Sequence, residues 1–287
     1  MRWRTGRRSS NVEDRRGSRM RRGMSRPGIK LGGGAIVLAF IAALLLGQDP
    51  SQIIGMIGGG QEAPPQQRPQ TNAPSDEVAD FVSVVLADTE DTWGSLFSSG
   101  GARYQAPKLV LYSDMVQSAC GMNSAAAGPF YCPGDYQVYL DLSFLRELQR
   151  LGASGDFSVA YVIAHEIGHH VQNLTGTSQQ VRNLQQQVSR TDANALSVLT
   201  ELQADCYAGV WAHHAHSQRN ILEQGDVEEG LRAAAAVGDD RLQRMSGRGV
   251  HPESFTHGTS QQRMQWFHTG LETGDTNACN TFAQLST

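Results

Sequence analysis

The sequence predicts an α+β fold, in which a helix-rich domain with a small sheet follows a single transmembrane helix. Long segments of the second half carry apolar residues at helical spacing, and two short segments alternate as strands do. A run of 17 uncharged residues, 31–47, precedes all of these segments. With 287 residues, 39% of them hydrophobic, the chain can form one sizeable domain with attachments.

The N-terminal charge distribution predicts how the chain meets a membrane. Residues 1–30 hold ten Arg and one Lys against Glu13 and Asp14, whereas the rest of the chain holds 13 basic and 26 acidic residues. An Arg-rich tail beside an apolar segment stays in the cytoplasm, so residues 31–47 are expected to be a single-pass anchor with the C-terminal domain outside. The tail then contacts lipid headgroups and does not bind nucleic acid. A cleaved signal peptide is the alternative, but the basic region is long for one and no small-x-small cleavage site follows it.

Behind the anchor, residues 48–75 are rich in Gly, Pro and Gln and are expected to form a linker, so the globular domain covers residues 76–287. Apolar spacing predicts a helix over 76–97, and alternation predicts strands at 108–112 and 136–141. Further helices are expected at 142–151, through the uncharged run at 159–164, at 178–189 and at 191–215.

Four cysteines fit a domain that is exported. An even number suggests two disulfides, and four cysteines allow three pairings. We favour Cys120–Cys132 as a local staple of a Gly- and Ala-rich loop, and Cys206–Cys279 as a link to the C-terminal segment. The alternative is four reduced, buried thiols.

The most informative motif is His165-Glu166-Ile167-Gly168-His169, which continues the uncharged helix. Helical residues four apart share one face, so both imidazoles can bind one metal ion, and two imidazoles suit Zn²⁺. The Glu166 carboxylate can take a proton from a zinc-bound water. A surface helix with ordinary polar residues is the alternative, and the core-like flanks argue against it.

A catalytic zinc needs a third protein ligand, and the helix at 191–215 offers two acids. Glu201 and Asp205 are four residues apart amid apolar and small neighbours. We assign Glu201 as the third ligand, and Asp205 as the acceptor of a hydrogen bond from a ligating imidazole. The alternative is an amphipathic helix with two solvated acids.

These motifs resemble those of gluzincins, the zinc peptidases whose third ligand is a glutamate on a later helix. More closely, the chain resembles a family of bacterial membrane-anchored proteins known as predicted neutral zinc metallopeptidases. The resemblance rests on the strings at 11–17, 128–133, 138–141, 164–172, 201–205 and 254–260. It implies a zincin fold and peptide-bond hydrolysis. Together with the charge asymmetry, it leads us to expect a location at the bacterial inner membrane, with the catalytic domain on the extracytoplasmic side.

Two further roles follow from the resemblance. Gluzincins bring a later histidine to the oxyanion, and His257 fits this role better than His251 because it lies within a family-like string. In zincins an edge strand that aligns the substrate precedes the metal helix, and the strand at 138–140 stands in that position.

The sequence therefore predicts a membrane-anchored zinc endopeptidase that acts on peptides or proteins of the cell envelope, with Glu166 as the base. A catalytically silent, zinc-stabilised binding or assembly module is the alternative. The retained Glu166 argues against it, because a structural site needs no base. The oligomeric state and the substrate cannot be derived from these residues.

Overall fold

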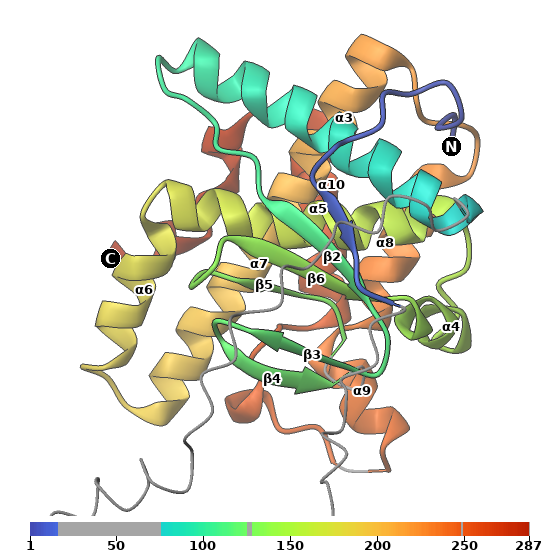
Figure 1. Ribbon diagram of the computed structural model, residues 1–287. Coiled ribbons are helices and arrows are strands. Elements are labelled where there is room, and N and C mark those ends of the chain that lie inside the picture. The colour runs from blue at the N-terminus through green and yellow to red at the C-terminus, as the bar shows by residue number, and fades with distance from the viewer. Residues whose placement is uncertain (17–75, 125–127, 248, 287) are drawn as a thin grey trace, which may run out of the picture. The chain divides into compact units, whose positions relative to one another are not determined.

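The structure, a computed structural model, describes residues 1–16, 76–124, 128–247 and 249–286, which lie in one compact unit (Figure 1). Helices predominate and a small sheet accompanies them, so the predicted α+β class is confirmed. The helices are α3 (Glu77–Ser99), α4 (Ser143–Arg150), α5 (Asp156–Leu174), α6 (Thr177–Gln185), α7 (Arg190–Arg219), α8 (Asp226–Ala236), α9 (Asp239–Met245) and α10 (Ser260–Thr273). Short 3-10 helices lie between α9 and α10 at η2 (Pro252–Ser254), and after α10 at η3 (Thr276–Cys279) and η4 (Thr281–Ser286).

A four-stranded sheet lies against the helices in the order β1-β2-β6-β5. Strands β1 (Val12–Asp14), β2 (Lys108–Tyr112) and β6 (Gln137–Asp141) are parallel, and β5 (Phe130–Cys132) runs antiparallel to β6. A separate hairpin joins β3 (Met115–Ser118) to β4 (Gly121–Ser124). The predicted edge strand is therefore internal: β6 is paired on both sides, and β5 is the edge strand beside it.

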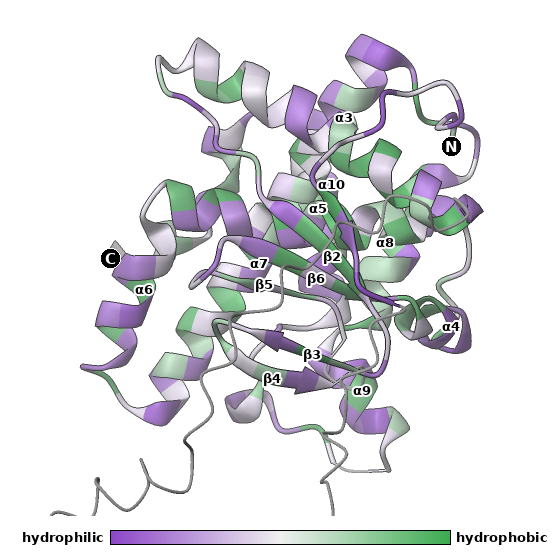
Figure 2. Cartoon of the chain, in the orientation of Figure 1, coloured by the Kyte–Doolittle hydropathy of each residue, from purple (hydrophilic) through white to green (hydrophobic). Residues whose placement is uncertain are grey.

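The core lies where the sheet meets α3, α5, α7 and α8. Residues 109–112 of β2 are all buried, as expected for an interior parallel strand with covered faces. Figure 2 shows hydrophobic residues gathered around β2, β6 and α8, whereas α6 is largely hydrophilic. The predicted solvated helix at 178–189 thus corresponds to α6, which ends four residues earlier.

Two helix crossings depend on glycine. A Cβ on Gly168 of α5 would lie 2.9 Å from the backbone oxygen of Ala204 on α7. On the other side of α7, a Cβ on Gly270 of α10 would lie only 1.9 Å from the backbone oxygen of Cys206. These close approaches bring α5, α7 and α10 into direct backbone contact, so polar side chains of all three helices can reach one another.

The N-terminal segment differs from its predicted role, because residues 1–16 pack within the domain. Strand β1 pairs with β2, and the ring of Trp3 packs edge-on against Phe81 of α3 with centroids 5.3 Å apart. The α-amino group of Met1 lies 2.8 Å from Asp156 Oδ1. Residues 1–16 of the expected cytoplasmic tail are thus part of the sheet and core, and residues 17–30 lie outside the described residues.

The charge of this segment is matched on α3. Arg7 donates to Glu90 and Asp91 at 2.8 Å, and Arg8 donates to Asp80 at 2.6 Å. Arg4 pairs with Glu77 in the same way. The described arginines Arg4, Arg7 and Arg8 of the predicted tail therefore bind carboxylates of the domain itself.

Both predicted disulfides are confirmed. Cys120 and Cys132 are joined with their Cα atoms 5.8 Å apart, and Cys206 and Cys279 with theirs 5.5 Å apart. The first bond ties the hairpin to β5, and the second ties α7 to η3.

The predicted anchor at 31–47 and linker at 48–75 lie outside the described residues. Within the described ranges, no helix is both long and apolar enough to cross a membrane.

Candidate metal centre

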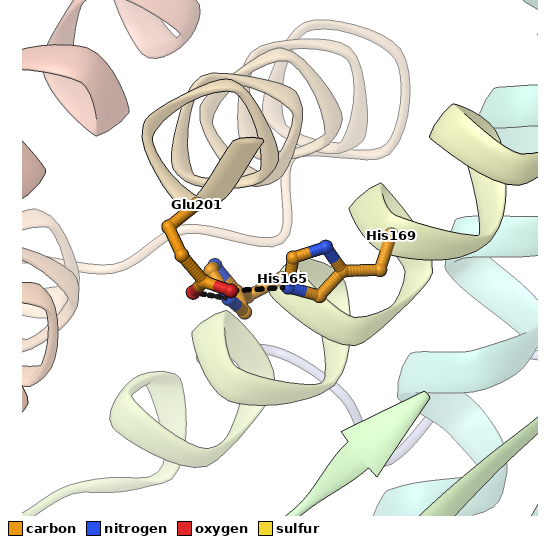
Figure 3. A group of neighbouring side chains, drawn as sticks. All are labelled: His165, His169 and Glu201. Atoms are coloured by element: carbon orange, nitrogen blue, oxygen red, sulfur yellow. Dashed lines mark hydrogen bonds and ion pairs between the residues drawn. The ribbon is translucent and has the colours of Figure 1, made fainter. Parts of the chain in front are cut away.

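Three predicted ligands converge between α5 and α7. Figure 3 shows His165 and His169, one turn apart on α5, facing Glu201 of α7. Nε2 of His165 lies 3.2 Å from Glu201 Oε2, and Nε2 of His169 lies 3.3 Å from Glu201 Oε1. One ligand atom from each residue falls within 4.8 Å of the others. The crossing at Gly168 explains the approach, because it lies on the same stretch of α5.

This arrangement fits zinc. Ligand atoms about 2.1 Å from a tetrahedral Zn²⁺ lie about 3.4 Å from one another, close to the two distances across Glu201. Two imidazoles and one carboxylate are also the donor set of many catalytic zinc sites, which leave one position open. The residues present therefore match the ion in both chemistry and spacing.

Hydrogen bonds orient both imidazoles with Nε2 toward Glu201. Nδ1 of His165 lies 2.8 Å from Asp205 Oδ1, and Nδ1 of His169 lies 2.9 Å from Gln172 Oε1. Each ring therefore donates from Nδ1 and keeps the Nε2 lone pair for a metal. The predicted role of Asp205 agrees with this contact.

The electrostatic potential at the metal group favours positive charge. Burial opposes a proton on His165, but the Asp205 carboxylate outweighs it and raises the pKa of His165 to about 10. Burial also opposes a proton on His169, and there Glu201 outweighs it and raises the pKa of that ring. Burial alone would raise the pKa of Glu201, yet attraction to His169 holds it well below its usual range. A divalent cation can supply the positive charge for which the group is arranged.

A further buried network lies behind His165. Arg263 of α10 binds Asp205 through two nitrogen atoms, with Nε 2.8 Å from Oδ2 and Nη2 2.9 Å from Oδ1. The hydroxyl of Tyr161 donates to Asp205 Oδ1. Burial would lower the pKa of Arg263, but the charge of Asp205 raises it well above the usual value. Asp205 thus stays ionised in the interior because its cation lies beside it.

Comparisons with known proteins place the chain in a family. The family model described as "Putative neutral zinc metallopeptidase" matches residues 1–282. The chain belongs to this family. Its relatives include Uncharacterized protein YpfJ of Escherichia coli (strain K12), 50% identical over 99% of both chains. Uncharacterized protein Rv2575 of Mycobacterium tuberculosis (strain ATCC 25618 / H37Rv) is 38% identical over 84% of this chain and 85% of its own. No solved structure matches the chain significantly.

The cofactor that this zinc metallopeptidase family implies is Zn²⁺, and the His165–His169–Glu201 group can hold it. The group opens into a cleft of about 1100 Å³ that Glu166 and His257 also line. Glu166 directly follows His165 on α5, is 7% exposed and contributes to the lining of this cleft.

The structure separates the two candidate histidines for oxyanion binding. His257 lines the metal cleft, whereas His251 lies in a smaller cavity beside α9 with its ring 3.3 Å from Glu253. Asp239 holds the His257 segment by accepting backbone hydrogen bonds from Thr256 at 2.8 Å, His257 at 2.6 Å and Gly258 at 3.0 Å. A hydrogen bond to Asp239 raises the pKa of the His257 ring.

Sequence reasoning missed three residues of this centre: Tyr161, Gln172 and Arg263. Tyr161 precedes His165 by four residues and therefore shares its helix face, a signal that could have identified it. Gln172 follows His169 by three residues and meets it for the same reason. Arg263 gives no local signal in the sequence, because its partners are about 60 and 100 residues away.

Proposed function

We propose that this zinc metallopeptidase is an endopeptidase that hydrolyses peptide bonds in its cleft with Glu166 as the general base. The observation that carries the proposal is the position of Glu166 beside a complete His–His–Glu group at an open cleft. A structural zinc site is closed by its protein ligands and needs neither a base nor access to a cleft. The alternative of a silent binding module therefore leaves both features without a role.

Each residue of the site has a separate role in the proposed reaction. When bound, Zn²⁺ would supply a Lewis acid that polarises the substrate carbonyl and makes water acidic near neutral pH. Glu166 takes the proton from the attacking water and passes it to the leaving amine. His257, with its raised pKa, presents a donor to the carbonyl oxygen as negative charge develops there. Asp205, Arg263 and Tyr161 hold the His165 ring in place.

Strand β5 is suited to align the substrate. Among the described residues it pairs with β6 alone, and its residues Phe130 and Tyr131 line the cleft. An extended peptide can therefore add to the open edge of β5 and lie across the metal group. This arrangement favours cleavage within an unfolded or loop segment of a polypeptide.

The same proposal covers the location of the enzyme. Two disulfides favour an oxidising compartment outside the cytoplasm. Because β1 pairs with β2, residues 1–16 must lie on the same side of any membrane as the domain. We therefore propose that both are extracytoplasmic and that the uncharged run at 31–47 attaches the protein to membrane lipid. This departs from the topology predicted from charge alone.

The decisive experiment measures metal content and peptide hydrolysis on the full-length protein. We expect about one zinc per chain, cleavage of some members of a peptide library, and loss of cleavage with a chelator. Glu166→Gln should retain zinc and lose hydrolysis, because it keeps the shape of the side chain but removes the base. Glu201→Ala should instead lose zinc, because it removes a ligand.

His257→Ala distinguishes oxyanion binding from packing. It should retain zinc and lower kcat by about a hundredfold or more, the usual effect of losing an oxyanion donor. His251→Ala is the matched control, since His251 does not line the metal cleft, and it should leave kcat unchanged. Full hydrolysis by Glu166→Gln would exclude the mechanism. Zinc binding without cleavage of any peptide would favour the binding module.

A further inference from the structure

The charges of the domain are distributed unevenly between its surface and its cleft. Residues 76–287 hold 12 Lys and Arg residues against 24 Asp and Glu residues. Yet four of these 12 cations line the metal cleft, compared with three of the 24 anions. Two of the three anions, Glu166 and Glu201, belong to the metal centre itself. Within residues 76–287 the cleft therefore holds a larger share of the cations than of the anions, whereas the arginines of residues 1–16 are matched on α3.

Two of the cleft arginines lack a carboxylate partner. The exposed side chain of Arg146 on α4 makes no hydrogen bond or ion pair with any described residue. Arg182 on α6 donates only to a neutral group, the Gln179 side-chain oxygen, at 2.8 Å. The other two cleft arginines are compensated: Arg150 lies 3.3 Å from Glu147, and Arg263 binds Asp205. Arg146 and Arg182 thus remain available to an anionic ligand.

The two free arginines of the cleft lie on different helices, Arg146 on α4 and Arg182 on α6. Helix α4 precedes α5 in the chain and α6 follows it, and Figure 1 shows them on opposite sides with α5 and β5 between. The 19 residues of α5 extend about 28 Å, and its metal-binding histidines lie between the two helices. A peptide that adds to β5 and crosses the metal group would pass Arg146 on one side of the scissile bond and Arg182 on the other.

We propose that the enzyme selects polypeptides that carry Asp or Glu residues on both sides of the scissile bond, with Arg146 and Arg182 as specificity-determining residues. This inference rests on the proposed endopeptidase function. Cations without a carboxylate partner in a cleft attract anionic ligands and raise their association rate. Each exposed Arg–carboxylate contact adds a factor of about 2 to 5 at low salt, and ions screen it at high salt.

The test compares three quenched fluorescent peptides on the full-length zinc enzyme. They share one cleavage sequence and carry Glu, Gln or Lys at the flanking positions. We expect kcat/KM for the Glu peptide to exceed that for the Gln peptide by about 5- to 20-fold at low salt, and the difference to shrink at high salt. The Lys peptide should be the poorest substrate.

Charge reversal assigns the preference to the named residues. Arg146→Glu and Arg182→Glu should each reduce the preference for the Glu peptide, and the double variant should favour the Lys peptide. Arg232→Glu is the matched control, because Arg232 is an exposed arginine of α8 outside the cleft, and it should change nothing. Fluorescence anisotropy of labelled peptides on Glu166→Gln gives a second readout, in which affinity should follow the same order.

The outcomes separate this inference from the proposed function. Equal kcat/KM for the Glu and Gln peptides, or a preference that survives both charge reversals, overturns the substrate class but leaves the endopeptidase intact. Absence of any hydrolysis overturns the endopeptidase function. The order of the peptide affinities measured by anisotropy then decides whether the cleft still selects acidic peptides. Equal affinity for all three peptides overturns the inference in either case.

Discussion

Asp205 of α7 connects three helices, α5, α7 and α10, beside the metal centre. Its carboxylate meets His165 and Tyr161 of α5 and Arg263 of α10, and it is fully buried. Burial would raise the pKa of Asp205, but the charge of Arg263 holds it below its usual range. The ring that binds metal is therefore positioned by an anion that is itself stabilised by a third helix.

Arg263→Gln should weaken both folding and zinc binding. Removing one partner of a buried ion pair costs about 3–5 kcal/mol, because the other charge stays buried without compensation. Loss of support behind a ligating histidine typically lowers metal affinity about 10- to 100-fold. Urea unfolding and a zinc competition titration measure the two effects. Arg232→Gln serves as the exposed control, and equal behaviour of both variants would contradict a positioning role for Arg263.

Spacing within one helix made most of this centre predictable. The pairs His165/His169 and Glu201/Asp205 each share a helix face, so their convergence needed only the packing of α5 on α7. Arg263 reaches Asp205 because α10 crosses α7 where Gly209 and Gly270 permit backbone contact. That crossing is a tertiary feature, and no local pattern around Arg263 encodes it.

At the scale of elements, Asp239 at the start of α9 fixes the segment that carries His257. One carboxylate oxygen accepts from three consecutive backbone N–H groups, those of residues 256–258. Burial would raise the pKa of Asp239, whereas hydrogen bonds from the His257 side chain and backbone lower it below its usual 3.8. A short helix thereby positions a histidine that belongs to the loop before α10.

Asp239→Asn should destabilise the protein at pH 7 by about 1–2 kcal/mol, since a charged acceptor becomes a neutral one. The folded pKa lies below the unfolded one, so the stabilisation is present above about pH 4 and is lost as pH falls through the folded pKa. The difference in stability between the variant and the parent should therefore be smaller at pH 3 than at pH 7. Unfolding curves at both pH values measure this, with Glu253→Gln as the exposed control. A constant difference at both pH values would exclude the role of the charge.

The two disulfides should differ in their contribution to stability. Cys206 and Cys279 are separated by 73 residues, and Cys120 and Cys132 by 12. In the chain-entropy description the longer loop contributes about 1.5 kcal/mol more. Replacing Cys206 and Cys279 by Ala should therefore lower the free energy of unfolding more than replacing the other pair. The reverse order in denaturant titrations would show that local strain or residual structure dominates.

Element prediction succeeded where one periodicity extended over several turns. Helices α5 and α7 were predicted within a few residues, and β2 was predicted at its observed bounds. Strands β1 and β5 have only three residues each, too few for alternation to show. The resemblance to zincins placed the edge strand at β6, and the short β5, which precedes β6 in the chain and pairs with its outer side, was not predicted.

At the scale of the whole molecule, the N-terminal segment is the main departure from prediction. An excess of arginine before an apolar run indicates a cytoplasmic tail when no partner is known. Here the partners lie on α3, whose carboxylates Glu77, Asp80, Glu90 and Asp91 face the same arginines. Charge complementarity between segments about 70 to 80 residues apart is not visible in a composition profile, so the packing of residues 1–16 on α3 was not predicted.

The fold therefore predicts that residues 1–16 and the domain are accessible from the same side of any membrane to which the protein is attached. All four cysteines are engaged in disulfides, so a single introduced cysteine gives a unique thiol. Thr5→Cys and Ser98→Cys place it at exposed positions of the N-terminal segment and of α3. In intact cells, a membrane-impermeant maleimide should label both variants, because the proposed location is extracytoplasmic. Labelling of Ser98→Cys alone would restore the topology expected from charge and would mean that β1 cannot pair with β2 in the cell. Labelling of neither until the cells are opened would place the whole enzyme in the cytoplasm.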